Sequence, residues 1–327
     1  MINIINIRGY NPKSLHDLNL SKEYVLELPR YIKKGQKISI LSDTMLKAMF
    51  QNENRLKYSA KFLSYFIDLD YEVILKNIYL AKNELDKEKE SSKGQRCDYV
   101  AVIDNTSLNI EVNNNSSLRV LERNIEYAYR LYSKKIKRGE REYDYTQVIQ
   151  FNLNNFSFKG NDKIIDIYGV KNDSNLTLSD KIIFVQIYVP NLRKKWYNEG
   201  IESLNEAEKY ILALVEMDIE KLKSLGGEEL MEEYVKEAEE VSFEGGVGEA
   251  YDKEWALRDQ GYRDGLSQGK AEGFSQGKAE GKAEGISEGK NEKNIEIAKN
   301  MLNEGIDINI ITKCTALTNE DINALRD

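Results

Sequence analysis

Two short segments hold the side chains whose types and spacing could do chemistry. Asp98 begins an apolar run of strand length, and after a turn Glu111 and Asn113 lie in the segment 109–113. Polar and apolar residues alternate in this second segment, so the side chains of Glu111 and Asn113 point to the same face of a strand. A hairpin would bring the carboxylates of Asp98 and Glu111 together. Such a pair can hold Mg²⁺, which usually keeps several waters and uses one or two protein carboxylates.

The chemistry that suits this pair is phosphodiester hydrolysis. That reaction requires charge neutralisation on the phosphate and an activated water, and a bound divalent ion supplies both. An Asp and a Glu at this spacing are a weak signal by themselves. Carboxylates at strand ends that face solvent are the alternative interpretation.

A basic amphipathic helix is predicted directly after the carboxylates, over residues 118–138. Its apolar positions recur every three or four residues, at Leu118, Leu121, Ile125, Ala128, Tyr129, Tyr132 and Ile136. Between residues 119 and 142 there are eight Lys or Arg against four Glu, in a chain of net charge −8. Arg123, Lys134 and Lys135 are our candidates for contact with a nucleic-acid backbone. A solvated helix face with local ion pairs is the alternative.

Further strands are predicted after the carboxylates, and helices are predicted before them. Residues 145–153, 163–168 and 181–189 are β-branched and aromatic runs of strand length. Before the carboxylates, residues 44–50 and 54–69 have helical spacing. The predicted order is helix, strands, carboxylate hairpin, helix, strand, strand, which is an α/β arrangement.

With these elements in order, the chain resembles the PD-(D/E)XK nuclease family transposases, also called recombination-promoting nucleases. The resemblance covers roughly residues 40–200 and, more loosely, the C-terminal tail. It rests on five segments, SDTMLKAMF (42–50), RCDYVAVID (96–104), LNIEVN (108–113), ERNIEYAYRLYSKKIKRG (122–139) and VIQFNLNNFSF (148–158). It implies a restriction-endonuclease-like core, a mixed central sheet flanked by helices, with an α-helical C-terminal extension.

The resemblance implies that Asp98 and Glu111 bind Mg²⁺ or Mn²⁺ and that Asn113 occupies the third catalytic position. The superfamily usually has Lys there, and this branch often has Gln. A Lys can stabilise negative charge that develops on the phosphate, whereas an amide can only hydrogen-bond. Cys97 also stands where a Pro often precedes the Asp.

Two functions are therefore kept. The first is a metal-dependent DNA endonuclease of the transposase or recombination-promoting type. The alternative is a catalytically impaired scaffold that binds nucleic acid or a protein. Asp43 and Lys47, on the segment 42–50, are possible accessory residues, or else a capping residue and a surface pair.

Composition excludes several other classes. The sole histidine, His16, rules out histidine-dependent triads and His-rich metal sites. No window approaches eighteen consecutive apolar residues, so we expect a cytoplasmic protein without a membrane span. Cys97 and Cys314 are predicted to be small buried hydrophobes in a reducing compartment.

The tail contains a glycine repeat. Glycine occupies every fourth position from 261 to 289. Glycines cost a lone helix about 1 kcal/mol each relative to Ala. We favour a weak spacer over the alternative, a helix supported by a close-packed partner chain.

Five segments follow from these patterns. They are an N-terminal extension (1–39), a nuclease-like domain (40–200), a helical segment (201–242), a hinge with the glycine spacer (243–292) and a small helical module (293–327). In the last, Asp307 and Thr318 are predicted helix caps. A homo-oligomer through the C-terminal region is a further expectation.

Overall fold

The computed structural model describes residues 20–21, 24–85, 95–114, 118–133, 147–172 and 174–325. The chain divides into two compact units, residues 1–256 and 257–327. The first unit contains every strand that the structure describes.

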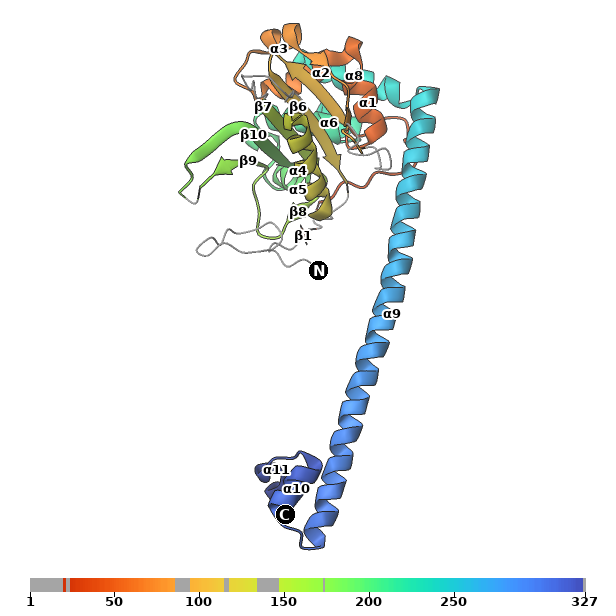
Figure 1. Cartoon of the computed structure of the whole chain (residues 1–327). Coiled ribbons are helices and arrows are strands. Elements are labelled where there is room, and N and C mark those ends of the chain that lie inside the picture. The colour runs from red at the N-terminus through yellow and green to blue at the C-terminus, as the bar shows by residue number, and fades with distance from the viewer. Residues whose placement is uncertain are drawn as a thin grey trace. The chain divides into compact units, whose positions relative to one another are not determined.

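A six-stranded mixed sheet forms the centre of the first unit (Figure 1). Its strands lie in the order β2 (Tyr79–Leu80), β5 (Tyr99–Ile103), β6 (Thr106–Asn113), β7 (Gln147–Asn154), β10 (Thr177–Tyr188) and β9 (Ile165–Lys171). The three central strands β6, β7 and β10 are parallel, and the outer pairings are antiparallel. Two minor pairs join β1 (Leu20–Ser21) to β8 (Ser157–Phe158) and β3 (Glu84–Leu85) to β4 (Gln95–Arg96). The predicted α/β class and mixed sheet are confirmed.

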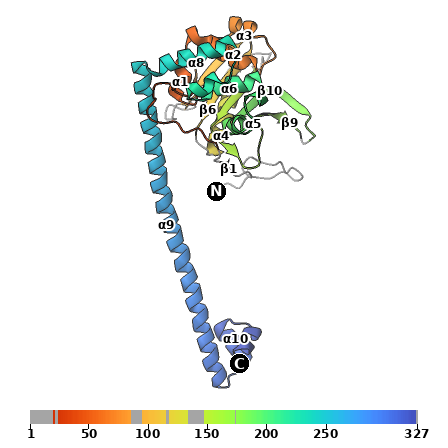
Figure 2. The same cartoon turned by 180° about the vertical axis from the view of Figure 1, so that it is seen from behind.

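The two faces of the sheet differ in chemistry. Leu108 and Ile110 of β6 face the main core, where Phe151 of β7 packs on Phe62 with ring centroids 5.6 Å apart. This core is closed by α1 (Asp43–Phe50), α2 (Leu56–Ser64), α5 (Val189–Glu199) and α6 (Glu206–Val215). The other face lies under α4 (Leu118–Ser133), as Figures 1 and 2 show from opposite sides. Alternate residues of β6 and β7 on that face are polar.

The buried side of α4 differs from the predicted one. Ile125 and Tyr129, assigned to the apolar stripe, are 44% and 51% exposed. The buried side chains are Leu121, Asn124, Tyr127, Ala128 and Leu131. Asn124 is buried because the sheet beneath it presents amides, a match that a search for apolar periodicity cannot detect.

The helices after residue 200 belong to the first unit. Together with α6, the helices α7 (Ile219–Lys223) and α8 (Glu229–Ser242) place Ile211, Leu222 and Tyr234 in the main core. The capping box of α6 is formed by Asn205 and Glu208. The core also takes Ile74 from α3 (Tyr71–Asn77).

The long helix α9 (Gly245–Asn303) begins on the first unit. Tyr251 is 2% exposed, and its hydroxyl donates to the Pro29 carbonyl at 2.6 Å. The Trp255 Nε1–H donates to the Leu28 carbonyl at 3.1 Å. The break between α8 and α9 is confined to Phe243 and Glu244, and the helix then continues through the predicted hinge and spacer.

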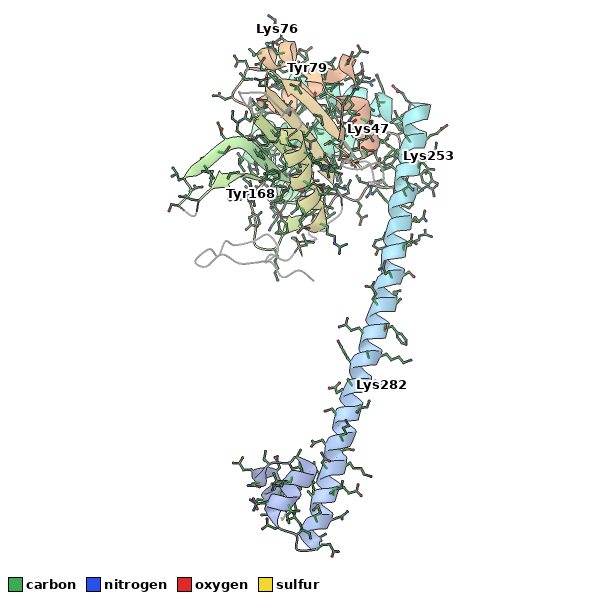
Figure 3. The ribbon with its side chains drawn as sticks, viewed as in Figure 1. Lys47, Lys76, Tyr79, Tyr168, Lys253 and Lys282 are labelled. Atoms are coloured by element: carbon green, nitrogen blue, oxygen red, sulfur yellow. The ribbon has the colours of Figure 1, made fainter. Side chains whose placement is uncertain are left out.

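All eight repeat glycines of α9 are exposed, and an added Cβ would meet nothing within 4 Å. Side chains such as Lys282 project from this part of the helix (Figure 3). Residues 261–289, for which the sequence favoured a weak spacer, are thus helical in the structure, and there is open space beside each glycine.

The second unit ends in α10 (Ile308–Thr315) and α11 (Asn319–Ala324). Ala298, Ile311 and Ile322 form its small core. Asp307 caps α10 and Thr318 caps α11 in a capping box with Asp321, as predicted. Cys97 is buried as expected, but Cys314 is exposed because it lies on the outer side of α10.

Candidate active site

The hairpin of β5 and β6 brings Asp98 and Glu111 together. Tyr99 pairs with Ile110 in this antiparallel hairpin, so Asp98 lies opposite Glu111. The Asp98 N–H donates to Glu111 Oε1 at 3.1 Å, and the Val112 N–H donates to Asp98 Oδ2 at 2.9 Å. Each carboxylate is therefore oriented by the backbone of the strand that carries the other.

Both carboxylates are held where a negative charge is poorly solvated. Burial and, to a lesser degree, the charge of Asp43 raise the pKa of Asp98 to about 6, although the Val112 N–H and the cations of Arg123 and Lys47 lower it. Burial, and then the Asp98 charge, raise the pKa of Glu111 well above its usual range. Without a cation, the pair thus retains protons at pH values above about 4, where exposed carboxylates have already released theirs.

The donor set fits a hard divalent ion. Glu111 is fully buried, and its Oε2 has no hydrogen-bond partner among the described residues. In the same part of the chain, no group of three or more His, Cys, Asp or Glu side chains could hold a metal. A carboxylate pair with one unsatisfied oxygen suits an ion such as Mg²⁺, which keeps most of its waters.

Asn113 lies on the same face as Glu111 but is enclosed by other amides. It is 1% exposed. Its Nδ2 donates to Asn154 Oδ1 at 2.8 Å, and its Oδ1 accepts from Asn124 Nδ2 at 3.0 Å. Because the side chain is buried beneath these amides, contact with a phosphate or a water would require Asn113 to become exposed.

The remaining candidates are distributed around the pair. Arg123 is exposed on α4, with its guanidinium 5.5 Å from the Tyr127 ring centroid. Its charge acts on both Asp98 and Glu111. Asp43 forms an ion pair on α1 with Lys47, which is labelled in Figure 3, and the charges of both residues also act on Asp98. Lys134 and Lys135 lie outside the described residues.

The structure adds one residue to the set found from the sequence. Gln51, the C-cap of α1, donates from its Nε2 to the Asp98 carbonyl. This bond fixes the end of α1 against the strand that begins at Asp98. Its position directly after the segment 42–50 was the only available signal, and no spacing rule links it to Asp98.

Comparison with protein families settles the relationship. The model of the PD-(D/E)XK nuclease family transposases matches residues 40–263. The chain belongs to this family. The matched range includes α6 to α8 and the start of α9, which agrees with their packing on the core.

A second model, the C-terminal HTH domain of the Rpn/YhgA-like nuclease family, matches residues 291–327. This range covers the end of α9 together with α10 and α11. Comparisons with curated proteins and with solved structures gave no significant match. None of the described helices is long and apolar enough to cross a membrane.

Proposed function

We propose that this PD-(D/E)XK transposase-family protein is a metal-dependent DNA endonuclease. The observation that carries the proposal is the Asp98–Glu111 pair, in which each carboxylate accepts an N–H from the other side of the hairpin and Glu111 Oε2 has no hydrogen-bond partner in the described residues. A buried and a half-buried carboxylate whose pKa values are raised by their surroundings are typical of functional sites.

In this proposal Asp98 and Glu111 hold Mg²⁺ or Mn²⁺. The bound ion would supply charge neutralisation at the phosphate and an activated water. The Asp98 and Val112 N–H groups keep the two carboxylates turned toward each other. Asn113 would orient the scissile phosphate or the water after exchanging its bond with Asn124.

The proposed partner is DNA. Arg123, exposed beside the carboxylates, would contact a backbone phosphate, and so would Lys134 and Lys135. The HTH unit is a second candidate for DNA contact, although Glu320 and Asp321 begin its last helix and would repel phosphates. Pairing of two chains through the C-terminal region is proposed as well.

The test is cleavage of supercoiled plasmid with Mg²⁺ or Mn²⁺. We expect nicked or linear product from the wild type and none from Asp98→Ala or Glu111→Ala. Asp104→Asn is the matched control, because Asp104 lies at the exposed turn of the same hairpin and tolerates its φ of 50° as Asn. Equal cleavage by all four proteins would exclude a role for the pair.

One observation favours the scaffold instead. The amide of Asn113 is sequestered, and no lysine occupies its position. A scaffold would bind DNA without cleaving it, and this binding would persist in Asp98→Ala and weaken in Arg123→Ala. Slower migration of a labelled DNA duplex in a native gel, together with no plasmid cleavage in Mg²⁺ or Mn²⁺, would support this second function.

A further inference from the structure

A continuous chain of buried amides lies on the sheet face under α4. It consists of Asn109 and Asn113 on β6, Gln150, Asn152 and Asn154 on β7, Gln186 on β10 and Asn124 on α4, and we call it the amide ladder. Six of the seven are at most 1% exposed, and Gln186 is 7% exposed. Glu111 stands between Asn109 and Asn113 on β6, so it is the one carboxylate set within this row.

The hydrogen bonds of the amide ladder fix the orientation of Asn152. Its Oδ1 accepts from Asn124 Nδ2 at 3.0 Å and from Gln150 Nε2 at 3.1 Å. Turning the amide over would place its NH₂ group against two donors, so the oxygen must stay on that side. The Nδ2 of Asn152 is therefore directed away from both, and it has no hydrogen-bond partner among the described residues.

Glu111 provides the complementary group. Glu111 and Asn152 are direct neighbours in the parallel register of β6 and β7, and both are fully buried. Glu111 Oε1 accepts from the Asp98 N–H, whereas Oε2 has no hydrogen-bond partner within the described part of the chain. An unpaired buried donor and an unpaired buried acceptor each cost free energy, and pairing them removes both costs.

We propose that Asn152 is a positioning residue for Glu111. The two side chains are not bonded to each other in the structure, and a side-chain adjustment would let Asn152 Nδ2 donate to one lone pair of Oε2, which leaves the other for the ion, while the rest of the amide ladder holds Asn152 in place. This inference rests on the proposed function, in which Glu111 binds a divalent ion. Outer partners of metal-binding carboxylates fix their orientation, and substituting such partners typically costs 10–100-fold in metal affinity. Asn152 would be such an outer partner of the Glu111 carboxylate.

The first test compares two substitutions that break equal numbers of ladder bonds. Asn152 takes part in two, and so does Asn154, which accepts from Asn113 and donates to Gln186. Mn²⁺ binding to the full-length protein is measured by calorimetry. We expect Asn152→Leu to weaken Mn²⁺ binding about 10-fold or more, and Asn154→Leu to leave it within about twofold of wild type. Equal losses, or no loss, would overturn the proposal.

The second test does not depend on a core substitution at Asn152. In ¹⁵N-labelled protein without metal, the side-chain NH₂ signal of Asn152 should move on Glu111→Gln, while that of Asn154 stays. An unchanged Asn152 signal would overturn the proposal even if the wild type binds Mn²⁺. If the wild type binds no Mn²⁺ but the Asn152 signal moves, the metal-dependent function fails while the Asn152–Glu111 bond stands.

Discussion

At Asp98 and Glu111, protonation would compete with the proposed binding of a divalent ion. The Glu111 carboxylate is buried and that of Asp98 is half-buried, and each accepts one backbone N–H. Without metal, a proton relieves the repulsion between them, whereas a divalent ion would relieve it at higher pH. The state of this pair should therefore be visible in the pH dependence of stability.

The metal-free protein should lose stability as pH rises. The folded pKa of Asp98 is about 6 against an ordinary value of 3.8, so the folded chain binds more protons between these values. The melting temperature in chelator should fall as pH increases from about 4 through 6, and added Mn²⁺ should raise it more at pH 7.5 than at pH 5. Asp98→Asn should flatten this slope, and Asp104→Asn should not. A slope of opposite sign in the wild type would contradict the prediction.

Asn113→Lys should destabilise the fold. The substitution removes the acceptor for Asn124 and places an ammonium within the amide ladder, where burial of unpaired polar groups costs about 1–3 kcal/mol each. Urea unfolding measures the loss, with the conservative Asn113→Gln as the comparison. A Lys variant that is as stable as wild type would show that the ladder can open there, and its plasmid cleavage could then be compared directly.

Among the elements, α1 connects the carboxylates to the start of α9. Gln51 at its end holds the Asp98 carbonyl, and Glu254 of α9 caps its beginning. The Glu254 carboxylate accepts from Ser42 Oγ at 2.6 Å and from the Thr44 N–H at 3.1 Å. A helix in contact with the site is thus secured by a residue that lies far away in sequence.

Glu254→Gln should lower the melting temperature by about 2–4 °C. The change replaces a carboxylate at the N-terminus of α1, where capping and helix-dipole interactions contribute about 1 kcal/mol. Glu249→Gln, an exposed glutamate on the same helix, is the control. Thermal unfolding followed by circular dichroism checks both, and equal shifts would show that the α1 contact contributes nothing specific.

Substituting the exposed glycines should strengthen α9. Replacing Gly269, Gly273 and Gly277 by Ala meets no steric obstacle and favours helix by about 0.5–1 kcal/mol per site. Far-ultraviolet circular dichroism should show higher helix content, with no change in the main melting transition. No gain in helix content would mean that this stretch is already fully helical in solution, for example through a paired chain.

The sequence predicted where helices and strands occur better than it predicted which of their side chains are buried. The hairpin and the helix after it were predicted from the spacing of apolar residues, and the strands β7 and β10 from β-branched and aromatic runs at 145–153 and 181–189. The amide ladder could not be predicted in this way, since alternating Asn and Gln look the same as a solvent-facing row. The ladder depends on the register of β6 with β7 and on Asn124 from α4, contacts that no local pattern contains.

For the whole molecule, the first compact unit extends to residue 256. The start of α9 contributes Tyr251 to the main core. Asp252 of the same helix forms an ion pair with Arg30, with 2.6 Å between Asp252 Oδ1 and Arg30 Nε. A protein that ends at residue 241 therefore lacks part of its own core. The end of the predicted helical segment at residue 242 is therefore not the end of the packed core.

Truncation at residue 256 should leave the melting temperature of the first unit unchanged, whereas truncation at 241 should lower it by about 10 °C or more. Loss of a buried aromatic alone costs about 3–5 kcal/mol, and each kcal/mol lowers the midpoint by about 2–4 °C in a domain of this size. Differential scanning calorimetry of the two truncated proteins and the full chain makes the comparison. Equal midpoints for all three would show that the start of α9 does not support the core.

The repeat of α9 is built from tetrads such as Gly269-Lys270-Ala271-Glu272, and Gly277-Lys278-Ala279-Glu280 has the same composition. Each tetrad adds about 6 Å of helix and about 40° beyond a full turn. Because no tetrad glycine contacts another part of the chain, one unit could be lost or duplicated without altering any packed surface. The length of α9 can therefore change in steps of one tetrad without changing the packing of the hydrophobic cores that precede and follow the repeat.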